Sequence, residues 1–270
     1  MPSHFVRNVL LGTAAALIGG TSFSPPAAAE PINTVHAATV VSAPAKTANT
    51  VAAVPAPTAS AAVVSAESQR AVTTLSSSVE HLSNSSALST AFHAYYAYQA
   101  AHPGDVTKPY LYFVDLGQSQ NAQRGYVFDM KSLTLVEGPF TVAQGAGSGS
   151  GVPTRFSNAA NSRASSLGLY VTANEYAFTG HSHGQPYSSV AVRLDGKSTG
   201  YNDNALARGV VAHGAPYVTA NSAGHSAGCT AMELTRAAKL VPMLANGSVV
   251  FVYAPNAQWL AHDPWVTAAV

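Results

Sequence analysis

Residues 210–215 have the sequence VVAHGA, and residues 224–230 have the sequence GHSAGCT. The first stretch is a short apolar run, typical of a buried strand, that ends on His213 and a glycine turn. The second is a loop of small residues that presents Cys229 just before a helical pattern begins. Small side chains around a thiol leave room for a substrate carbonyl, and backbone amides in such a loop can stabilise an oxyanion. Together the two stretches predict a nucleophilic cysteine with a histidine base.

Cys229 is the single cysteine of the 270 residues, so the chain cannot form an internal disulfide. A free thiol titrates near ~8.5 and needs a neighbouring base to become a good nucleophile. The alternative is a buried cysteine that serves as a small hydrophobic side chain, which is common. His225 is closer in sequence to Cys229 than His213 is, but four residues along a loop seldom give suitable geometry. His213 is therefore the favoured base.

Residues 1–29 have the pattern of a secretory signal peptide. Arg7 supplies the positive charge, residues 9–18 form an apolar run, and Ala27–Ala29 provide small residues for cleavage after Ala29. The apolar run is shorter than the ~20 residues that span a membrane, and no later segment is a transmembrane candidate. We therefore expect secretion to the periplasm or the cell wall.

The rest of the chain divides by composition. Residues 30–66 are rich in Ala, Pro, Val and Thr, which predicts a disordered tether. Residues 67–85 give no clear signal, and a helical lead-in is one interpretation. Residues 86–270 are expected to form one mainly β domain with peripheral helices at 87–101 and 234–244, the second kinked or split by Pro242. The expected strands are residues 110–116, 126–129, 133–136, 140–143, 167–172, 190–194, 210–212 and 249–253.

The charge balance argues against nucleic acid as a partner. Charged residues make up 9% of the chain, against ~25% in typical soluble proteins. The formal net charge is +1, and the sequence contains no basic tract. Histidines at 181, 183, 213 and 225 raise the alternative of zinc, but their spacing matches no helix-based zinc motif, so no metal is expected.

The order of these motifs resembles a known family. His213-Gly214 followed by Ser226-x-Gly228-Cys229 resembles the signature of the YkuD-like L,D-transpeptidase catalytic domain, in its murein-specific branch. The resemblance runs from about residue 86 to residue 253 and implies a mainly β domain, a sandwich or mixed sheet with peripheral helices. Further stretches that resemble the same branch are residues 110–115, 156–158, 165–170, 183–184, 193–196 and 202–205.

The resemblance also implies a reaction. The cysteine attacks the third-residue carbonyl of a peptidoglycan stem tetrapeptide, D-alanine leaves, and an amine of a second stem peptide resolves the thioester. Carried over to this chain, Cys229 is the nucleophile and His213 the base, with the Gly214 carbonyl orienting the imidazole. The amides of Gly228 and Cys229 face the oxyanion. Stem peptides are then the partners, carbapenem β-lactams the expected inhibitors, and no cofactor is implied.

Other positions are candidate substrate contacts or depart from the family pattern. Ser226 is expected to line the pocket, and Ala227 stands where many members carry a histidine, aromatic or basic residue. Thr230-Ala231 replaces polar residues after the cysteine, and Gln144 stands where this branch often has histidine. The remaining candidate substrate contacts are His183, Asn204 and Arg208.

Arg208 has two interpretations. It could pair with a stem-peptide carboxylate, or it could form a structural salt bridge to Asp203 or Asp195. The overall function also has alternatives: an L,D-carboxypeptidase with water as acceptor, a zinc peptidase, or a wall-binding module without catalytic activity.

Overall fold

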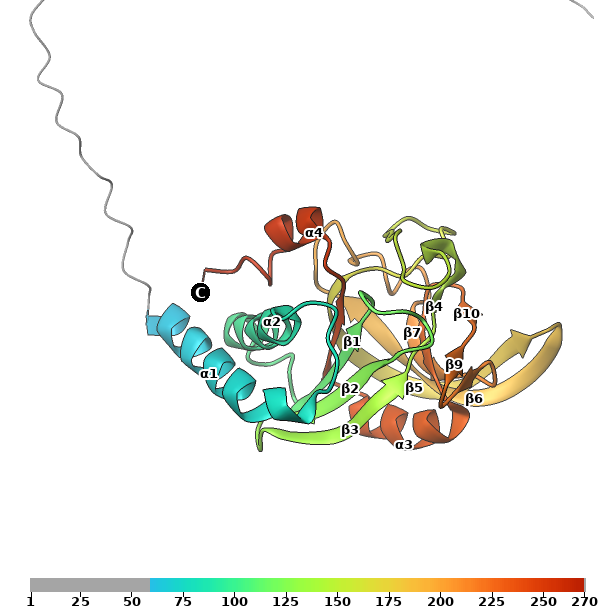
Figure 1. Cartoon of the computed structure of the whole chain (residues 1–270), viewed down its shortest axis with the longest axis horizontal. Coiled ribbons are helices and arrows are strands. Elements are labelled where there is room, and N and C mark those ends of the chain that lie inside the picture. Colours follow the sequence, from blue (N-terminus) through green and yellow to red (C-terminus); the bar gives the residue numbers. More distant parts are fainter. Residues whose placement is uncertain (1–58, 270) are drawn as a thin grey trace, which may run out of the picture. The chain divides into compact units, whose positions relative to one another are not determined.

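The computed structural model describes residues 59–269, and its main element is one eight-stranded mixed sheet (Figure 1). The strand order is β11-β7-β6-β5-β12-β1-β2-β3, in which β1–β12 and β11–β7 are parallel neighbours. This confirms the expected mainly β domain, and the mixed sheet is the arrangement observed. Its strands are β1 (Tyr110–Asp115), β2 (Gln123–Asp129), β3 (Thr134–Thr141), β5 (Gly168–Ser182), β6 (Gln185–Gly196), β7 (Val211–Gly214), β11 (Thr230–Met232) and β12 (Val249–Tyr253).

Two small sheets and several helices complete the described part. The small sheets pair β4 (Gln144–Gly145) with β10 (His225–Ser226) and β8 (Val218–Thr219) with β9 (Ser222–Ala223). The helices are α1 (Ala59–Leu75), α2 (Ala87–Ala101), α3 (Leu234–Leu244) and α4 (Ala257–His262), with 3-10 turns η1 (Ser76–Ser78) and η2 (Ala146–Ser148). No helix within residues 59–269 has the length and apolar character needed to cross a membrane.

The helices predicted at 87–101 and 234–244 are α2 and α3. Pro242 lies in the last turn of α3, which runs unbroken to Leu244, so the predicted split of this helix is wrong. The two strands predicted around Gly138-Pro139 are one strand, β3, whose pairing with β2 contains register shifts. The largest difference is the β5–β6 hairpin, which extends far beyond the apolar runs 167–172 and 190–194.

The core forms on both faces of the sheet. All five residues of β12 are buried, which requires cover on both sides because alternate side chains point to opposite faces. Helix α2 packs on β1 and β12, and α3 packs on β5, β6 and β7. Figure 1 shows α2 to the left of β1 and α3 below the strands.

Helix α1 corrects the predicted domain boundaries. The expected signal peptide (1–29) and residues 30–58 of the expected tether lie outside the described residues. Residues 59–66 are helical, not tether, and α1 packs on α2. The last proline before α1 is Pro57, and the alanine-rich sequence that follows favours helix. Val64, Ala71 and Leu75 are buried along one stripe of this helix, which explains why it packs.

Two strands at the edge of the sheet position the predicted catalytic pair. β7 carries His213, and β11 begins one residue after Cys229. The two strands are parallel, with Thr230 opposite Ala212 and Ala231 opposite His213. The outer side of β11 is bridged by Ala143 opposite Ala231. The predicted base therefore lies on β7 and the predicted nucleophile directly before β11, at the same edge of the sheet.

We expect Val64→Ala to destabilise the domain and Val63→Ala to leave it unchanged. Val64 is 2% exposed and Val63 is 62% exposed, although they are neighbours on α1. Burying a valine side chain contributes about 1.5–3 kcal/mol, which corresponds to a fall in Tm of roughly 3–12 °C for a domain of this size. Thermal unfolding followed by circular dichroism measures the difference. Equal Tm values for the two variants would show that α1 does not belong to the folded unit.

Candidate active site

His213 is a buried imidazole with a fixed orientation. Its side chain is 2% exposed, and Nδ1 lies 2.9 Å from the Gly214 carbonyl oxygen. A neutral imidazole that donates through Nδ1 keeps Nε2 as an acceptor. Burial lowers the pKa of His213, against a smaller opposing effect of the Gly214 carbonyl. The Phe178 ring packs on the imidazole with centroids 4.6 Å apart. His213 is therefore neutral near pH 7 and suited to accept a proton at Nε2.

The hydroxyl of Ser226 closes the turn of residues 226–229, which we call the cysteine turn. Its Oγ accepts a hydrogen bond from the Gly228 amide at 3.1 Å and donates one to the Cys229 carbonyl at 2.7 Å. Gly228 has a backbone φ of +123°, a conformation that residues other than glycine rarely adopt. The expected role of the Gly228 amide as an oxyanion donor conflicts with this bond, because its N–H is already used. Ser226 holds the turn, and its predicted contact with substrate stays a prediction.

The cysteine turn rests on β4. Gly145 of β4 pairs with Ser226 of β10, and a Cβ added to Gly145 would lie 2.8 Å from the Gly228 Cα. Only glycine fits there. The neighbouring Gln144 is fully buried, donates to the Gly149 carbonyl and accepts from Arg124 at 2.6 Å. Gln144 thus holds β4 in place through its side-chain amide.

Arg124 is itself fully buried beneath this layer. It donates to the carbonyls of Val142 and Gln118 as well as to Gln144. Burial lowers its pKa to about 10, so it remains a cation at neutral pH. A fixed buried cation therefore supports the strand on which the cysteine turn lies.

The Cys229 thiol is partly buried, with Sγ 4.0 Å from the Gly209 carbonyl oxygen. Burial raises the pKa of the thiol, and the Val211 backbone amide and the Arg208 guanidinium act in the opposite direction. At neutral pH the site therefore contains a thiol and a neutral imidazole, not a thiolate–imidazolium pair. Such a pair needs proton transfer during attack, which is general base catalysis.

Arg208 holds the segment that flanks the cysteine turn. One terminal nitrogen donates to the Ser157 carbonyl and Ser166 Oγ, and the other donates to Ser162 Oγ and the Ala164 carbonyl, at 2.5–3.2 Å. The second of these nitrogens would lie 3.4 Å from a Cβ on Gly228, so the guanidinium borders the turn.

Neither predicted partner of Arg208 is bonded to it. Asp195 pairs with Lys197 at 2.7 Å, and Asp203 accepts from Asn158 at 2.6 Å. The predicted salt bridge from Arg208 to one of these carboxylates is therefore wrong. The predicted contact with a stem-peptide carboxylate would require breaking bonds that already use both terminal nitrogens.

The remaining predicted residues are dispersed. His183 is exposed at the turn between β5 and β6, with its Nδ1 3.2 Å from Ser182 Oγ. Asn204 is exposed and bonded to Asn158, and Ala227 is exposed in the cysteine turn. In the part of the chain that the structure describes, no recorded bond or ring contact joins His183 or Asn204 to Cys229 or His213.

His225, the alternative base, belongs to β10 beside Gln144. Its Nε2 is buried without a hydrogen-bond partner among the described residues. Over residues 59–269, no group of three His, Cys, Asp or Glu side chains is arranged to hold a metal ion.

Sequence reasoning missed an aromatic group beside the catalytic pair, formed by Phe178, Tyr187 and Tyr217. Phe178 and Tyr187 lie 6.2 Å apart, and Tyr187 and Tyr217 lie 6.4 Å apart, centroid to centroid. Burial raises the pKa of both phenols. Both hydroxyls therefore stay protonated and can donate. One signal for this group is present in the sequence: Phe178 and Tyr187 lie between the two apolar runs predicted as strands, 167–172 and 190–194.

We expect Arg208→Gln to raise the pKa of the Cys229 thiol and to destabilise the domain. The substitution removes the positive charge beside the thiol and leaves carbonyl and hydroxyl acceptors without their donors. Hydrogen bonds to charged groups contribute about 1.5–3 kcal/mol each, so the free energy of unfolding should fall by at least that amount. The pH dependence of alkylation by iodoacetamide measures the thiol, and thermal unfolding measures stability.

Two further variants control this experiment. Arg208→Lys should keep part of the effect on the thiol, because it keeps the charge without the planar fork. Arg193→Gln removes a guanidinium that lies over the Tyr176 ring and should leave the alkylation profile unchanged. Identical alkylation profiles for the wild type and Arg208→Gln would contradict an electrostatic role of Arg208.

Comparisons with solved structures give partial matches of low identity. An L,D-transpeptidase from Mycobacterium smegmatis is 18% identical, with a TM-score of 0.33, over 54% of this chain and 59% of that one. A mutant L,D-transpeptidase of Enterococcus faecium is 15% identical, with a TM-score of 0.33, over 54% and 50%. L,D-transpeptidase 3 from Mycobacterium tuberculosis, solved with a faropenem-derived adduct, is 13% identical, with a TM-score of 0.31, over 53% and 60%.

This chain thus spans half to three fifths of the length of these solved structures. No curated protein matches it. The model of the family described as the L,D-transpeptidase catalytic domain matches residues 80–253, which include Cys229, His213 and the β sheet that positions them. This match covers well over half of the 270 residues of the chain. The chain therefore belongs to the L,D-transpeptidase catalytic domain family.

Proposed function

We propose that the protein is a peptidoglycan L,D-transpeptidase whose nucleophile is Cys229. The observation that carries the proposal is the arrangement at the sheet edge. Cys229 immediately precedes β11, whose first residue pairs with Ala212, the neighbour of His213 on β7. The parallel pairing keeps the start of β11 beside the strand that carries His213. The thiol lies next to the segment that leads into β7, with Sγ 4.0 Å from the Gly209 carbonyl oxygen, and Nε2 is the nitrogen of His213 that does not bond to Gly214.

In the first half of the reaction, His213 Nε2 takes the proton of the thiol as Sγ attacks the third-residue carbonyl of a stem tetrapeptide. The S–C bond forms, the C–N bond to D-alanine breaks, and the imidazolium returns its proton to the leaving amine. In the second half, an amine of another stem peptide attacks the thioester. A C–N bond forms, the C–S bond breaks, and the amine proton returns to sulfur through His213. No external reductant or cofactor enters the balance.

The oxyanion donors proposed here differ from those that the resemblance implied. With the Gly228 amide bonded to Ser226, the Cys229 amide is the backbone donor of the turn. The phenols of Tyr187 and Tyr217, which burial keeps protonated and which join His213 through the Phe178 ring, are the candidates for a second donor. Donors that are already oriented before reaction stabilise a developing oxyanion most effectively.

The substrate also bears on localisation. Peptidoglycan lies outside the cytoplasmic membrane, so the proposed reaction requires export. We propose that residues 1–29 direct this export and that the enzyme acts in the periplasm or the wall.

Purified protein incubated with disaccharide tetrapeptide should yield a cross-linked dimer that has lost one D-alanine, detected by mass spectrometry. Tripeptide without dimer would assign an L,D-carboxypeptidase, and no reaction would favour a wall-binding module. Cys229→Ala should abolish turnover. His213→Gln should lower acylation by roughly 10²- to 10⁴-fold, and His225→Gln should have little effect. A larger loss in His225→Gln would mean that His225 is the base.

The pH profile provides a second readout of the same assignment. Burial lowers the pKa of His213, so the acidic limb of the acylation profile should lie below the ordinary histidine value of ~6.5. An acidic limb above that value would contradict a buried neutral base.

A carbapenem such as imipenem should acylate Cys229, because its strained carbonyl can enter the same oxyanion geometry as the substrate. Intact-mass analysis should show one added inhibitor mass, located on the peptide that contains Cys229. The adduct should be absent in Cys229→Ala and unaffected by EDTA. An adduct on a serine, or activity lost to EDTA and restored by zinc, would contradict the cysteine mechanism.

A further inference from the structure

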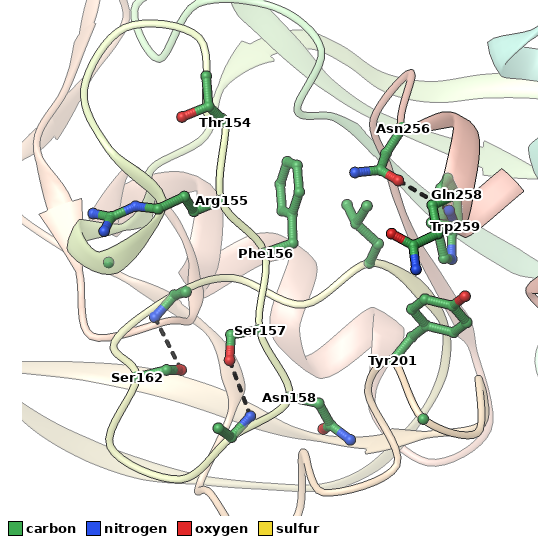
Figure 2. A pocket seen from close by; sticks show the side chains of 15 residues that line it. Thr154, Arg155, Phe156, Ser157, Asn158, Ser162, Tyr201, Asn256, Gln258 and Trp259 are labelled. Carbon is green, nitrogen blue, oxygen red and sulfur yellow. Dashed lines mark hydrogen bonds between the residues drawn. The ribbon is translucent and has the colours of Figure 1, made fainter.

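A cavity of about 790 Å³ lies beside the cysteine turn without containing the catalytic pair (Figure 2). Its volume is within the range of ~300–1,000 Å³ typical of small-molecule sites. The wall comes from three segments: the loop that follows β4, the turn before Asn202, and the start of α4. Figure 2 shows Thr154, Arg155 and Phe156 on one side and Asn256, Gln258 and Tyr201 on the other.

The lining combines aromatic rings with side-chain amides and lacks carboxylates. The rings belong to Phe156, Tyr201 and Trp259, and the amides belong to Asn158, Asn256 and Gln258. Trp259 is 1% exposed and donates to Asp263, so its ring is a fixed part of the wall, whereas Phe156 and Tyr201 are partly exposed.

Some polar side chains of the cavity are hydrogen-bonded to other protein groups, and others can bond to a ligand. Asn158 is held by Asp203, and Asn256 accepts from the Trp259 amide at the start of α4. The side chains of Gln258 and Arg155 are exposed, and no hydrogen bond is recorded for either in the described part of the chain. Preformed walls with a few available donors and acceptors are what a ligand site requires.

We propose that this cavity binds an N-acetylated sugar of the wall polymer, an inference that rests on the proposed function. Pyranose rings have apolar C–H faces that pack on aromatic rings. Their hydroxyl and acetamido groups need both donors and acceptors, and the amides of asparagine and glutamine supply both. No carboxylate lines the cavity, and the Arg155 guanidinium offers N–H donors to hydroxyl and acetamido oxygens.

The position of the cavity agrees with the covalent structure of the substrate. Ser162 and Ala164 line the cavity and bond to Arg208, and the Ala164 carbonyl would lie 3.0 Å from a Cβ on Gly228. One backbone segment therefore separates the cavity from the cysteine turn. The three residues that join a sugar to the attacked carbonyl span up to about 10 Å when extended, enough to pass such a segment.

Titration of the wild-type protein with chitotetraose, a β-1,4-linked tetramer of N-acetylglucosamine, tests the proposal by calorimetry. We expect saturable binding that Gln258→Ala weakens roughly three- to tenfold, the effect of losing one or two hydrogen bonds. Gln69→Ala removes an exposed glutamine on α1, which does not line this cavity, and should bind as the wild type does. Absent binding, or equal binding by Gln258→Ala and the wild type, would overturn the proposal. Displacement of chitotetraose by free tetrapeptide would assign the cavity to peptide and overturn it as well.

Kinetics separate this inference from the proposed function. Gln258→Ala should raise KM for disaccharide tetrapeptide and leave KM for sugar-free tetrapeptide unchanged, with kcat unchanged for both. An equal effect on both substrates would contradict sugar binding. If neither substrate is turned over, the proposed function fails, and the chitotetraose titration still decides what the cavity binds.

Discussion

The parallel pairing of β7 with β11 is the interaction on which the site depends. It sets Ala231 opposite His213 and Thr230 opposite Ala212. Cys229, the residue before β11, therefore lies close to the start of β7. Two parallel strands cannot be joined by a tight hairpin. The chain between them instead forms β8, β9 and β10, and β10 adds to β4 before the cysteine turn. The edge of the sheet therefore determines the geometry of the nucleophile.

The site is built with few charges, in keeping with a chain of 9% charged residues. Thiol and imidazole are both neutral near pH 7, because burial raises the pKa of one and lowers that of the other. The cations nearby, Arg124 and Arg208, donate to carbonyl, amide and hydroxyl oxygens. Each guanidinium thus fixes backbone segments around the turn, and the charge of Arg208 also lowers the pKa of the Cys229 thiol.

The irregular loop after β4 connects the two parts of the proposed enzyme. Gly145 packs on Gly228, and residues 162–166 lie between Arg208 and the cavity that we assign to sugar. The same segment therefore borders the nucleophile on one side and a ligand site on the other. A polymeric substrate with peptide and sugar parts would occupy both sides of this segment.

The sequence by itself determined the elements with strong local signals. Helices α2 and α3, the hairpin of β2 and β3, β12, and the His213 and Cys229 pair follow from periodicity, apolar runs and one motif of small residues. The alanine-rich start of α1 was read as tether, because composition alone does not show that Val64 will find α2 to pack against. The length of the β5–β6 hairpin was also missed, since its outer residues are half-exposed and carry no continuous apolar run.

Only the tertiary structure decided how the side chains are used. From the sequence, Ser226, Gly228 and Arg208 were predicted to contact the substrate or the oxyanion. The structure shows that their hydrogen bonds close and support the cysteine turn, which no local pattern indicated. Phe178 of β5, Tyr187 of β6 and Tyr217 of the turn before β8 meet only when the chain folds. Local patterns specify strands and motifs, whereas the partners of polar groups depend on contacts between residues far apart in the chain, which no local pattern encodes.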